Sequence, residues 1–369
     1  MNKIVYILPI LAFVLIQMGG CIDEPEPEAG IDLSGINYDP KPYIFGAMPS
    51  SYPAMEIPAD NPMTIDGVQL GRHLFFDPIL SADSSMSCIS CHNPASSFTD
   101  GKAVSVGIDG ISGIRSSMSL LDIGFAYKGL FWDGRSKDLE DQAGRPVEDP
   151  IELHHTWPNL EIKLQNSVFY QSLFRKAFGI SNSKEITKDL ATKAIAQFER
   201  IIVSSGTSKF DQFLAGKYDL SEDEYLGYDL FFDVNVDVPD AQCGHCHNAP
   251  FMTVNDYFNN GIQSADSLNQ FKDFGHGNVT KKPLDNGKFK VPTLRNIALS
   301  APYMHDGSFA SVEAVIDHYD SGGHYSPNKD PLIAKVHLTT LQKSQILSFL
   351  HTLTDTVALK NPLFINPFD

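Results

Sequence analysis

The feature that most constrains this 369-residue chain is a unit of sequence that occurs twice. Leu70-Gly-Arg-His-Leu-Phe-Phe-Asp77 precedes Cys88-Ile-Ser-Cys91-His92, and Leu226-Gly-Tyr-Asp-Leu-Phe-Phe-Asp233 precedes Cys243-Gly-His-Cys246-His247 at nearly the same distance. A long internal repeat of this kind indicates duplication of one structural unit. We therefore expect each copy to form one domain.

The spacing Cys-x-x-Cys-His is typical of covalent haem attachment. Its two thiols can bond to the vinyl groups of one porphyrin while the adjacent histidine reaches the iron. The two copies predict two covalently bound c-type haems, held by Cys88, Cys91, Cys243 and Cys246, with His92 and His247 as iron ligands. A redox-active cysteine pair and a zinc site are the alternatives. The two histidines and the repeat favour haem.

Helical periodicity dominates the rest of the chain. Leucines and phenylalanines at i, i+4 spacing predict an amphipathic helix at the start of each copy, over 67–77 and 223–233. Further helices are predicted over 136–144, 159–178, 184–204, 311–320 and 339–353. Strand signals are few, and the long polar loops 81–117 and 234–292 are typical of domains organised around a cofactor. The expected fold is mainly α, with two tandem cytochrome c-like domains over 61–205 and 206–355 and a tail over 356–369.

The fifth cysteine, Cys21, follows a segment with the properties of an export signal. Lys3 supplies positive charge, residues 4–16 are apolar but short for a membrane span, and small residues precede Cys21. We interpret residues 1–20 as a lipoprotein signal and Cys21 as its lipidated residue, with an ordinary secretory signal as the alternative. Residues 21–60, which begin acidic and proline-rich, are expected to be an extended, solvated tether. The predicted location is the periplasm or cell envelope, attached by lipid to the outer membrane.

The charge balance narrows the classes of partner. Lys and Arg number 28 against 45 Asp and Glu, which gives a formal net charge of −17. This charge repels phosphate backbones, so nucleic acid is excluded as a partner. A small basic electron-transfer protein would be attracted instead. A homodimer is compatible with the sequence but is not indicated by any motif.

Several linked motifs over residues 58–355 resemble the bacterial di-haem cytochrome c peroxidase and MauG family. Besides the two haem motifs they are Leu70 to Pro78, Phe131-Trp-Asp-Gly-Arg135, Val291-Pro-Thr-Leu-Arg-Asn296 and Pro302-Tyr-Met-His-Asp-Gly307. The resemblance implies a peroxidase that reduces hydrogen peroxide to water at the first haem, with electrons from a small periplasmic cytochrome c or cupredoxin. Two other functions stay open. One is a MauG-type oxidase that modifies an aromatic residue of a partner protein, and the other is a di-haem electron carrier without enzyme activity.

The resemblance also implies roles for three residues. Gln142 and Glu152, ten and twenty residues after Trp132, match residues on the distal side of the first haem, and Trp132 matches the tryptophan between the haems. A carboxyl group can move a proton between the two oxygens of peroxide, and a neutral amide can hold the peroxide in place. Without the resemblance, a surface carboxylate, a helix-face amide and a core aromatic would be the ordinary interpretations.

Two positions depart from the usual peroxidase pattern. Ile108 stands where many family peroxidases have a loop histidine that closes the first iron, so we expect that iron to keep an open sixth position. Tyr319 stands where the second iron usually has a methionine, and MauG-type members have a tyrosine there. A phenolate ligand lowers the potential of an iron that thioether sulfur would raise. Met304 and His318 are the nearby alternatives to Tyr319.

Calcium and the haem propionates complete the predicted sites. The family holds calcium between its domains with an asparagine that is replaced here by Ser116, and with backbone oxygens that match Ser300 and Pro302. Loss of the amide oxygen removes a good hard ligand and weakens the prediction of Ca²⁺. Arg115 and Arg295 are expected to pair with haem propionates. Ordinary ion pairs between the domains are the alternative for both arginines.

Overall fold

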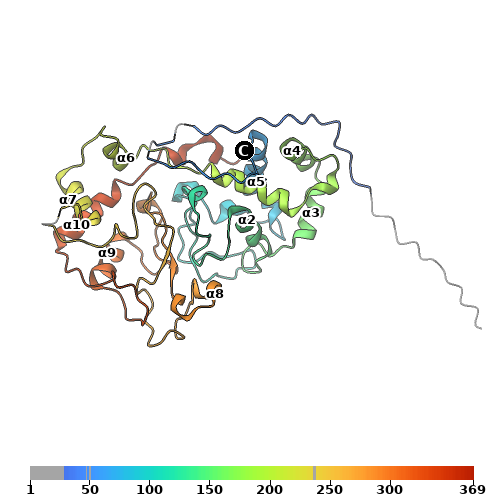
Figure 1. Ribbon diagram of the computed structural model, residues 1–369. Helices are drawn as coiled ribbons and strands as arrows, with labels where there is room; N and C mark the ends of the chain where they lie inside the picture. The colour runs from blue at the N-terminus through green and yellow to red at the C-terminus, as the bar shows by residue number, and fades with distance from the viewer. Residues whose placement is uncertain (1–28, 47, 50, 236–237) are drawn as a thin grey trace, which may run out of the picture.

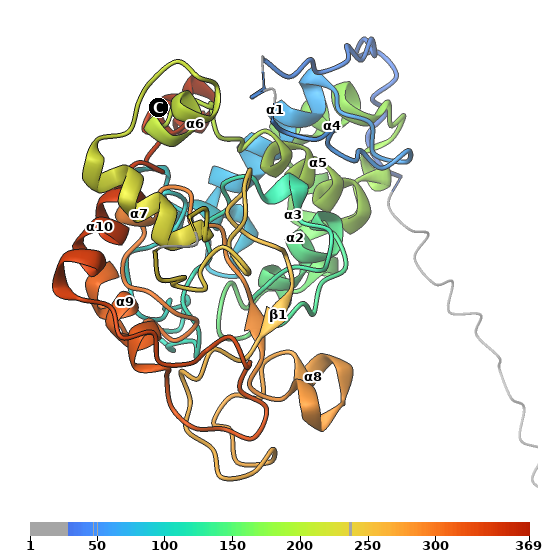
Figure 2. The same ribbon diagram turned by 60° about the vertical axis from the view of Figure 1, so that its left-hand side comes forward.

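The computed structural model describes residues 29–46, 48–49, 51–235 and 238–369, and the fold is mainly helical, as expected. The predicted signal segment and Cys21 lie outside the described residues. Figure 1 shows α1 (Ile65–Phe76), α2 (Leu139–Glu148), α3 (Trp157–Gln165), α4 (Val168–Phe178) and α5 (Lys188–Arg200) gathered on one side. On the other side lie α6 (Lys209–Leu214), α7 (Glu222–Phe232), α9 (Val312–Ser321) and α10 (Thr340–His351). A short antiparallel pair, β1 (Tyr257–Phe258) and β2 (Phe289–Lys290), lies near α8 (Gly277–Thr280) (Figure 2).

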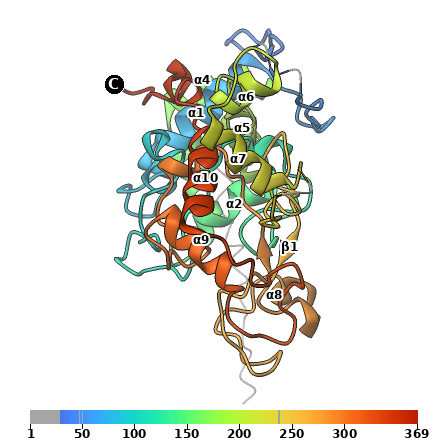
Figure 3. The same ribbon diagram turned by 90° about the vertical axis from the view of Figure 1, so that its left-hand side faces the viewer.

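Each half has its own hydrophobic core, and both cores are built on the same helix crossing. In the first half α1 packs on α5, and in the second half α7 packs on α10 (Figure 3). A Cβ added to Gly71 of α1 would lie 1.9 Å from the carbonyl oxygen of Ala194. A Cβ added to Gly227 of α7 would lie 1.9 Å from the carbonyl oxygen of Gln345. The Leu-Gly pair of each sequence repeat is therefore the point where two helices touch.

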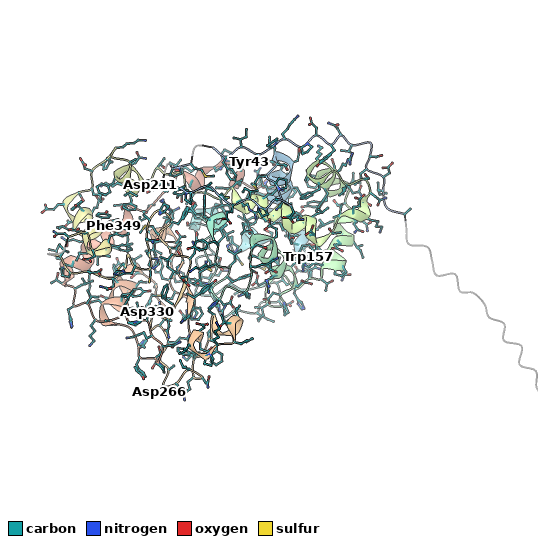
Figure 4. The ribbon with its side chains drawn as sticks, in the orientation of Figure 1. Tyr43, Trp157, Asp211, Asp266, Asp330 and Phe349 are labelled. Atoms are coloured by element: carbon teal, nitrogen blue, oxygen red, sulfur yellow. The ribbon has the colours of Figure 1, made fainter. Side chains whose placement is uncertain are left out.

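The helices that open the two copies confirm the predictions over 67–77 and 223–233 to within two residues. Thr64 caps α1 by accepting a hydrogen bond from the Gly67 N–H, and Ser221 caps α7 in a capping box with Glu224. Each helix buries its apolar face in its own core. Figure 4 labels Trp157 in the first core and Phe349 in the second.

Two predicted helices are shorter than expected because polar side chains cap the backbone inside the apolar pattern. The segment 159–178 is two helices, α3 and α4, since Ser167 begins α4 by accepting a hydrogen bond from the Tyr170 N–H. The segment 184–204 contains a 3₁₀ turn, Ser183–Glu185, before α5. Periodicity alone does not detect such an internal cap, because the apolar positions continue in register across it.

The described residues among 29–60 differ from the solvated tether expected over 21–60. Leu33 is 3% exposed in the first core, its N–H donates to the Ser181 carbonyl (2.8 Å), and the Tyr43 N–H donates to the Met63 carbonyl (3.0 Å). Tyr52 reaches the boundary between the halves, where its ring contacts Phe251. The prediction weighted the acidic start of this segment and overlooked the apolar side chains that follow it. Burial of those side chains offsets the conformational entropy lost when the segment becomes ordered. Figure 4 labels Tyr43 in this part of the molecule.

The C-terminal segment returns to the first half of the chain. Phe364 is buried against Phe98 and Phe198, and the Arg72 guanidinium donates to the Ile365 carbonyl (2.6 Å). The predicted tail over 356–369 therefore packs against the hydrophobic core of the first half. Within the described residues, the helices are too short or too polar to cross a membrane.

Candidate functional site

The histidines of the two Cys-x-x-Cys-His motifs have matching surroundings. His92 Nδ1 lies 3.0 Å from the Phe98 carbonyl oxygen, and His247 Nδ1 lies 3.0 Å from the Met252 carbonyl oxygen. Because a carbonyl oxygen only accepts, each Nδ1 carries a proton and each Nε2 keeps a lone pair for a metal. Burial lowers the pKa of His247 to about 4 and also lowers the pKa of His92, so both rings are neutral at pH 7. Both are therefore prepared to ligate iron.

The motif cysteines do not have the properties of a redox pair or a zinc site. None of the four forms a disulfide with another described cysteine. A redox-active cysteine needs a lowered thiol pKa, whereas burial raises the pKa of Cys243 to about 12 and that of Cys246 to about 11. The described part of the chain has no group of three or more His, Cys, Asp or Glu side chains placed to hold a metal ion. The raised thiol pKa values disfavour the redox-active pair.

A large apolar cavity adjoins the second motif. Cys243, Cys246 and His247 line it together with Tyr319 and Met304. Most of its remaining wall is aliphatic or aromatic and includes Phe231, Val315, Ile316 and Leu350. Free thiols, an available imidazole nitrogen and an apolar wall are the features that a covalently bound haem requires, so these residues fit the group.

Lys290 is a residue of this site that sequence reasoning missed. It is 5% exposed, it lines the cavity, and its backbone N–H donates to the Trp132 carbonyl (2.8 Å). Its amine lies 3.5 Å from the Asn255 carbonyl oxygen and over the Tyr257 ring, and burial lowers its pKa to about 8 against the opposing effect of the Asp256 charge. A buried cation needs an anionic partner, and haem propionates are anions of the required kind. The sequence signal was a lysine between Phe289 and Val291, where an apolar residue is expected.

Arg115 and Arg295 both pair with aspartates. Arg115 donates to Asp133 (2.6 Å) and to Asp273 (2.7 Å), which joins the first half of the chain to the second. Arg295 donates to Asp211 through both terminal nitrogens, at 3.0 and 2.8 Å. Arg115 thus forms the ion pair between the halves that was the alternative to propionate binding. Propionate binding by either arginine stays a prediction.

Trp132 connects the surroundings of the two motifs. Its ring lines the cavity of the second motif, and its Nε1–H donates to the Ser116 carbonyl (2.9 Å). The next residue, Ser117, has its hydroxyl 3.3 Å from His92 Nδ1 and donates it to the Cys91 carbonyl (2.6 Å). A short path of bonded and hydrogen-bonded atoms thus leads from Trp132 to the first motif.

Glu152 lies beside the first motif and beneath the loop that contains Ile108. The Ile108 N–H donates to the Glu152 carbonyl (3.1 Å). Gly107 permits this close approach, because a Cβ there would lie 1.7 Å from the Ile151 carbonyl oxygen. Burial raises the pKa values of Cys88 and Cys91, and the charge of Glu152 adds a smaller effect in the same direction, so Glu152 lies near both thiols.

The Glu152 carboxylate has an unusual environment for a charged group. It accepts no hydrogen bond from the described residues, and burial together with the nearby charge of Asp149 raises its pKa to about 7, against the opposing effect of Arg135. A carboxyl group with this pKa can both accept and release a proton near neutral pH. Gln142 is half-buried in the first turn of α2, ten residues before Glu152. Its side-chain amide makes no hydrogen bond within the described residues.

Two of the three candidate ligands for the second iron lie in the cavity. Tyr319 and Met304 both line it, and both accept a hydrogen bond from the Asn260 amide, at 3.1 Å to the tyrosine oxygen and 3.4 Å to the sulfur. The ring of His318 instead donates from Nε2 to the Asn260 carbonyl (3.0 Å). His318 is therefore engaged with the backbone rather than turned toward the second motif.

The residues predicted to hold calcium also border this cavity. Ser116, Ser300 and Pro302 line it, but the Ser116 hydroxyl donates to the Met304 carbonyl (2.9 Å). The binding of Ca²⁺ stays a prediction.

Comparison with known proteins gives concordant results. The model of the family described as di-haem cytochrome c peroxidase matches residues 66–219. Cytochrome c551 peroxidase of Nitrosomonas europaea is 36% identical over 318 residues, which are 84% of this chain and 86% of that protein. The methylamine utilization protein MauG of Methylophilus methylotrophus is 33% identical over 317 residues, 85% of this chain and 88% of that protein. A crystal structure of a MauG-like protein associated with microbial copper homeostasis superposes with a TM-score of 0.79 at 34% identity, covering 87% of this chain and 99% of that one.

Proposed function

This chain belongs to the di-haem cytochrome c peroxidase and MauG family and is a peroxidase-type oxidoreductase, and from this premise we propose that it reduces hydrogen peroxide to water with electrons from a small periplasmic redox protein. One peroxide, two electrons and two protons give two waters. The observation that carries the proposal is the Glu152 carboxyl, which is half-buried near the first motif, accepts no hydrogen bond from the described residues and has its pKa raised to about 7, mainly by desolvation.

The proposed roles of the side chains follow from their chemistry. When bound, the two haems supply the redox chemistry. Glu152 takes a proton from one peroxide oxygen and returns it to the other, so that water rather than hydroxide leaves. The Gln142 amide, with one acceptor oxygen and donor hydrogens, orients the peroxide. Ile108 has no atom that can ligate iron and so leaves space for the peroxide.

The proposed electron path runs from the second motif to the first. The donor would deliver electrons near His247, and they would pass Trp132 on the way to His92. The contact of Trp132 with the second cavity and its link through Ser116 and Ser117 to the first motif support this path. The formal net charge of −17 favours a basic cytochrome c or cupredoxin as the donor.

A second candidate function is MauG-type oxidation of an aromatic residue on a partner protein. The hydroxyl of Tyr319 in the second cavity favours this candidate, because a phenolate ligand lowers the potential of the iron that it binds. A pure electron carrier, the third possibility, has no use for a Glu152 carboxyl whose pKa is raised to about 7.

The remaining features of the proposal concern assembly and location. We propose two tandem cytochrome c-like domains, over 61–205 and 206–355, each with one covalently attached haem. Lipid on Cys21 would hold the protein in the periplasm or cell envelope, at the outer membrane. Calcium between the halves and a homodimer are compatible with this arrangement.

A steady-state assay separates these functions. The purified di-haem protein is mixed with hydrogen peroxide and a reduced basic cytochrome c, and oxidation of the cytochrome is followed by absorbance. We expect sustained turnover that weakens as the salt concentration rises, since screening reduces the attraction between acidic enzyme and basic donor. Peroxide consumption that requires an added substrate protein would favour the MauG-type function. No consumption under either condition would contradict both enzymatic functions.

Ile108 allows a separate test of the open first iron. We expect the resting ferric protein to show one high-spin haem by electron paramagnetic resonance, because no side chain at position 108 can close the sixth position. Replacing Ile108 by histidine should convert that signal to low-spin, since the loop is held over Glu152. Ile111→His is the control, because Ile111 belongs to the same loop and is half exposed. A wild-type resting spectrum with two low-spin haems would contradict the expectation.

A further inference from the structure

Asn260 stands between the two candidate ligands of the second iron. Its Nδ2 donates to the Tyr319 hydroxyl oxygen at 3.1 Å and lies 3.4 Å from the Met304 sulfur. All three residues line the cavity that contains Cys243, Cys246 and His247. One amide group therefore contacts both the phenol and the thioether that could reach the same metal.

The amide of Asn260 has a defined orientation. Its Oδ1 accepts a hydrogen bond from the Ile262 N–H (3.2 Å), so Nδ2, with its two hydrogens, must face Tyr319 and Met304. The backbone of Asn260 is held as well, because His318 donates from Nε2 to the Asn260 carbonyl (3.0 Å). His318 precedes Tyr319 on α9. The same helix turn therefore positions the His318 ring, which donates to the Asn260 backbone, and the Tyr319 hydroxyl, which accepts from the Asn260 amide.

We propose that Asn260 is a positioning residue that makes Tyr319, rather than Met304, the ligand of the second haem iron. The inference rests on the proposed function, in which haem occupies this cavity. An N–H that donates to a phenol oxygen stabilises the anionic phenolate more than the neutral phenol, because hydrogen bonds to charged acceptors are the stronger ones. The same donor engages the Met304 sulfur and holds it at the amide.

The neighbouring Asn259 shows what a purely structural asparagine does here. Its amide donates to Ser326 (2.9 Å) and to Asn328 (2.9 Å), and its oxygen accepts from the Gly261 N–H (3.0 Å). These contacts hold one loop to another and lie away from the cavity wall. Asn260 differs because its donor hydrogens are directed only at the two side chains that could bind iron.

The test compares ferric holoproteins by optical absorption, electron paramagnetic resonance and the midpoint potential of the second haem. Asn260→Leu removes the donor with little change in volume. We expect it to lower the ratio of tyrosine-ligated to methionine-ligated haem at least about tenfold, the size of effect that loss of a charge-assisted hydrogen bond has on an equilibrium. The near-infrared band of thioether ligation should appear, and the midpoint potential should rise. Asn260→Asp, which has nearly the same shape and also lacks the donor, should act in the same direction.

Three further variants make the reading specific. Asn278→Leu is the matched control, because Asn278 is exposed on α8, and its spectrum should equal that of the wild type. In Asn260→Leu combined with Met304→Leu the thioether band should vanish. In a Tyr319→Phe background, Asn260→Leu should have no further effect on tyrosine ligation, since a residue that acts through Tyr319 cannot act once the hydroxyl is gone.

The outcomes separate this inference from the proposed function. If Tyr319→Phe changes the low-spin spectrum but both Asn260 variants leave it and the potential unchanged, the role of Asn260 is overturned while Tyr319 ligation stands. If Tyr319→Phe leaves the spectrum unchanged, Tyr319 is not the ligand and the inference falls with it. Peroxide turnover by the wild type is measured independently, so either result leaves the test of peroxidase activity intact.

Discussion

Replacement of Glu152 by glutamine is expected to lower the turnover of hydrogen peroxide by about 10²–10⁴-fold, the usual contribution of a general acid–base group. Glutamine keeps the size of the side chain and its hydrogen-bonding capacity but cannot accept a proton from one peroxide oxygen and return it to the other. Haem content and the spectrum of the second haem should be unchanged. Steady-state kinetics on the loaded variant give the measurement.

Glu148→Gln is the control for that experiment. Glu148 is the last residue of α2, is exposed, and pairs with Lys188 at 2.8 Å on the surface. Its replacement should leave turnover close to that of the wild type, because an exposed ion pair contributes at most about 1 kcal/mol to stability and takes no part in the proposed chemistry. Equal effects of the two substitutions, or near-normal turnover by Glu152→Gln, would show that Glu152 is not the acid–base group.

The raised pKa of Glu152 also predicts the pH dependence. Because the pKa is about 7, the carboxylate that accepts the first proton is lost as the pH falls below this value, and kcat/KM should drop about tenfold per pH unit there. The variant Glu152→Gln should lack this acidic limb. Stability changes with pH in the opposite direction to activity. Folding raises the pKa of this carboxyl from 4.5 to about 7, so the free energy of unfolding falls as the pH rises between these two values. Glu152→Gln lacks this titrating group. The difference in free energy of unfolding between the variant and the wild type should therefore shift in favour of the variant when the pH is raised from 5 to 8.

Replacement of Gly227 by alanine is expected to destabilise the second half by more than about 3 kcal/mol, beyond the ordinary cost of overpacking. The added Cβ would lie 1.9 Å from the Gln345 carbonyl oxygen and 2.9 Å from Phe349 Cβ. The first of these atoms belongs to the backbone of α10, so relief requires α7 and α10 to separate. Because single domains are stable by only about 5–15 kcal/mol, denaturant unfolding monitored at the second haem should shift strongly.

Gly71 and Gly35 make this prediction specific. Gly71→Ala should act on the first half in the same way, because its Cβ would lie 1.9 Å from the Ala194 carbonyl oxygen. Gly35→Ala is the control, since nothing lies within 4 Å of its added Cβ. We expect that substitution to change the free energy of unfolding by no more than about 0.5 kcal/mol. A Gly227→Ala protein as stable as the control would contradict the proposed packing of the repeat.

The duplicated motif predicted more of the fold than any other feature. It located the helices that open the two halves, and the structure adds that the glycine of each copy is the contact point with the last long helix of its half. The segment 29–60 was misjudged because composition averages over a stretch, whereas burial depends on single residues such as Leu33. The apolar period of 159–178 likewise concealed the cap at Ser167.

Some residues of the candidate site were predicted from the sequence, and others were found only in the structure. The residues of the haem motifs and Glu152 were predicted from spacing and from the family resemblance. Lys290 and Asn260 were not, because nothing local distinguishes a lysine or an asparagine that ends in a cavity from one that ends in solvent. The role of Lys290 follows from the burial of its side chain in the cavity, and that of Asn260 from its contacts with Tyr319 and Met304, which the fold alone brings near.

By itself the sequence determined what depends on neighbours along the chain. Thiols three residues apart and an adjacent histidine can serve one haem wherever they lie, and helical periodicity is local by nature. Only the tertiary structure decided which side chains share the second cavity. Asn260 is 59 residues from Tyr319 and 44 from Met304, and the hydrogen bonds that join them arise only when the loop after β1 packs against α9 and the segment before it. Burial, desolvation and the direction of a hydrogen bond are properties of that closed space, so they had to be read from the folded chain.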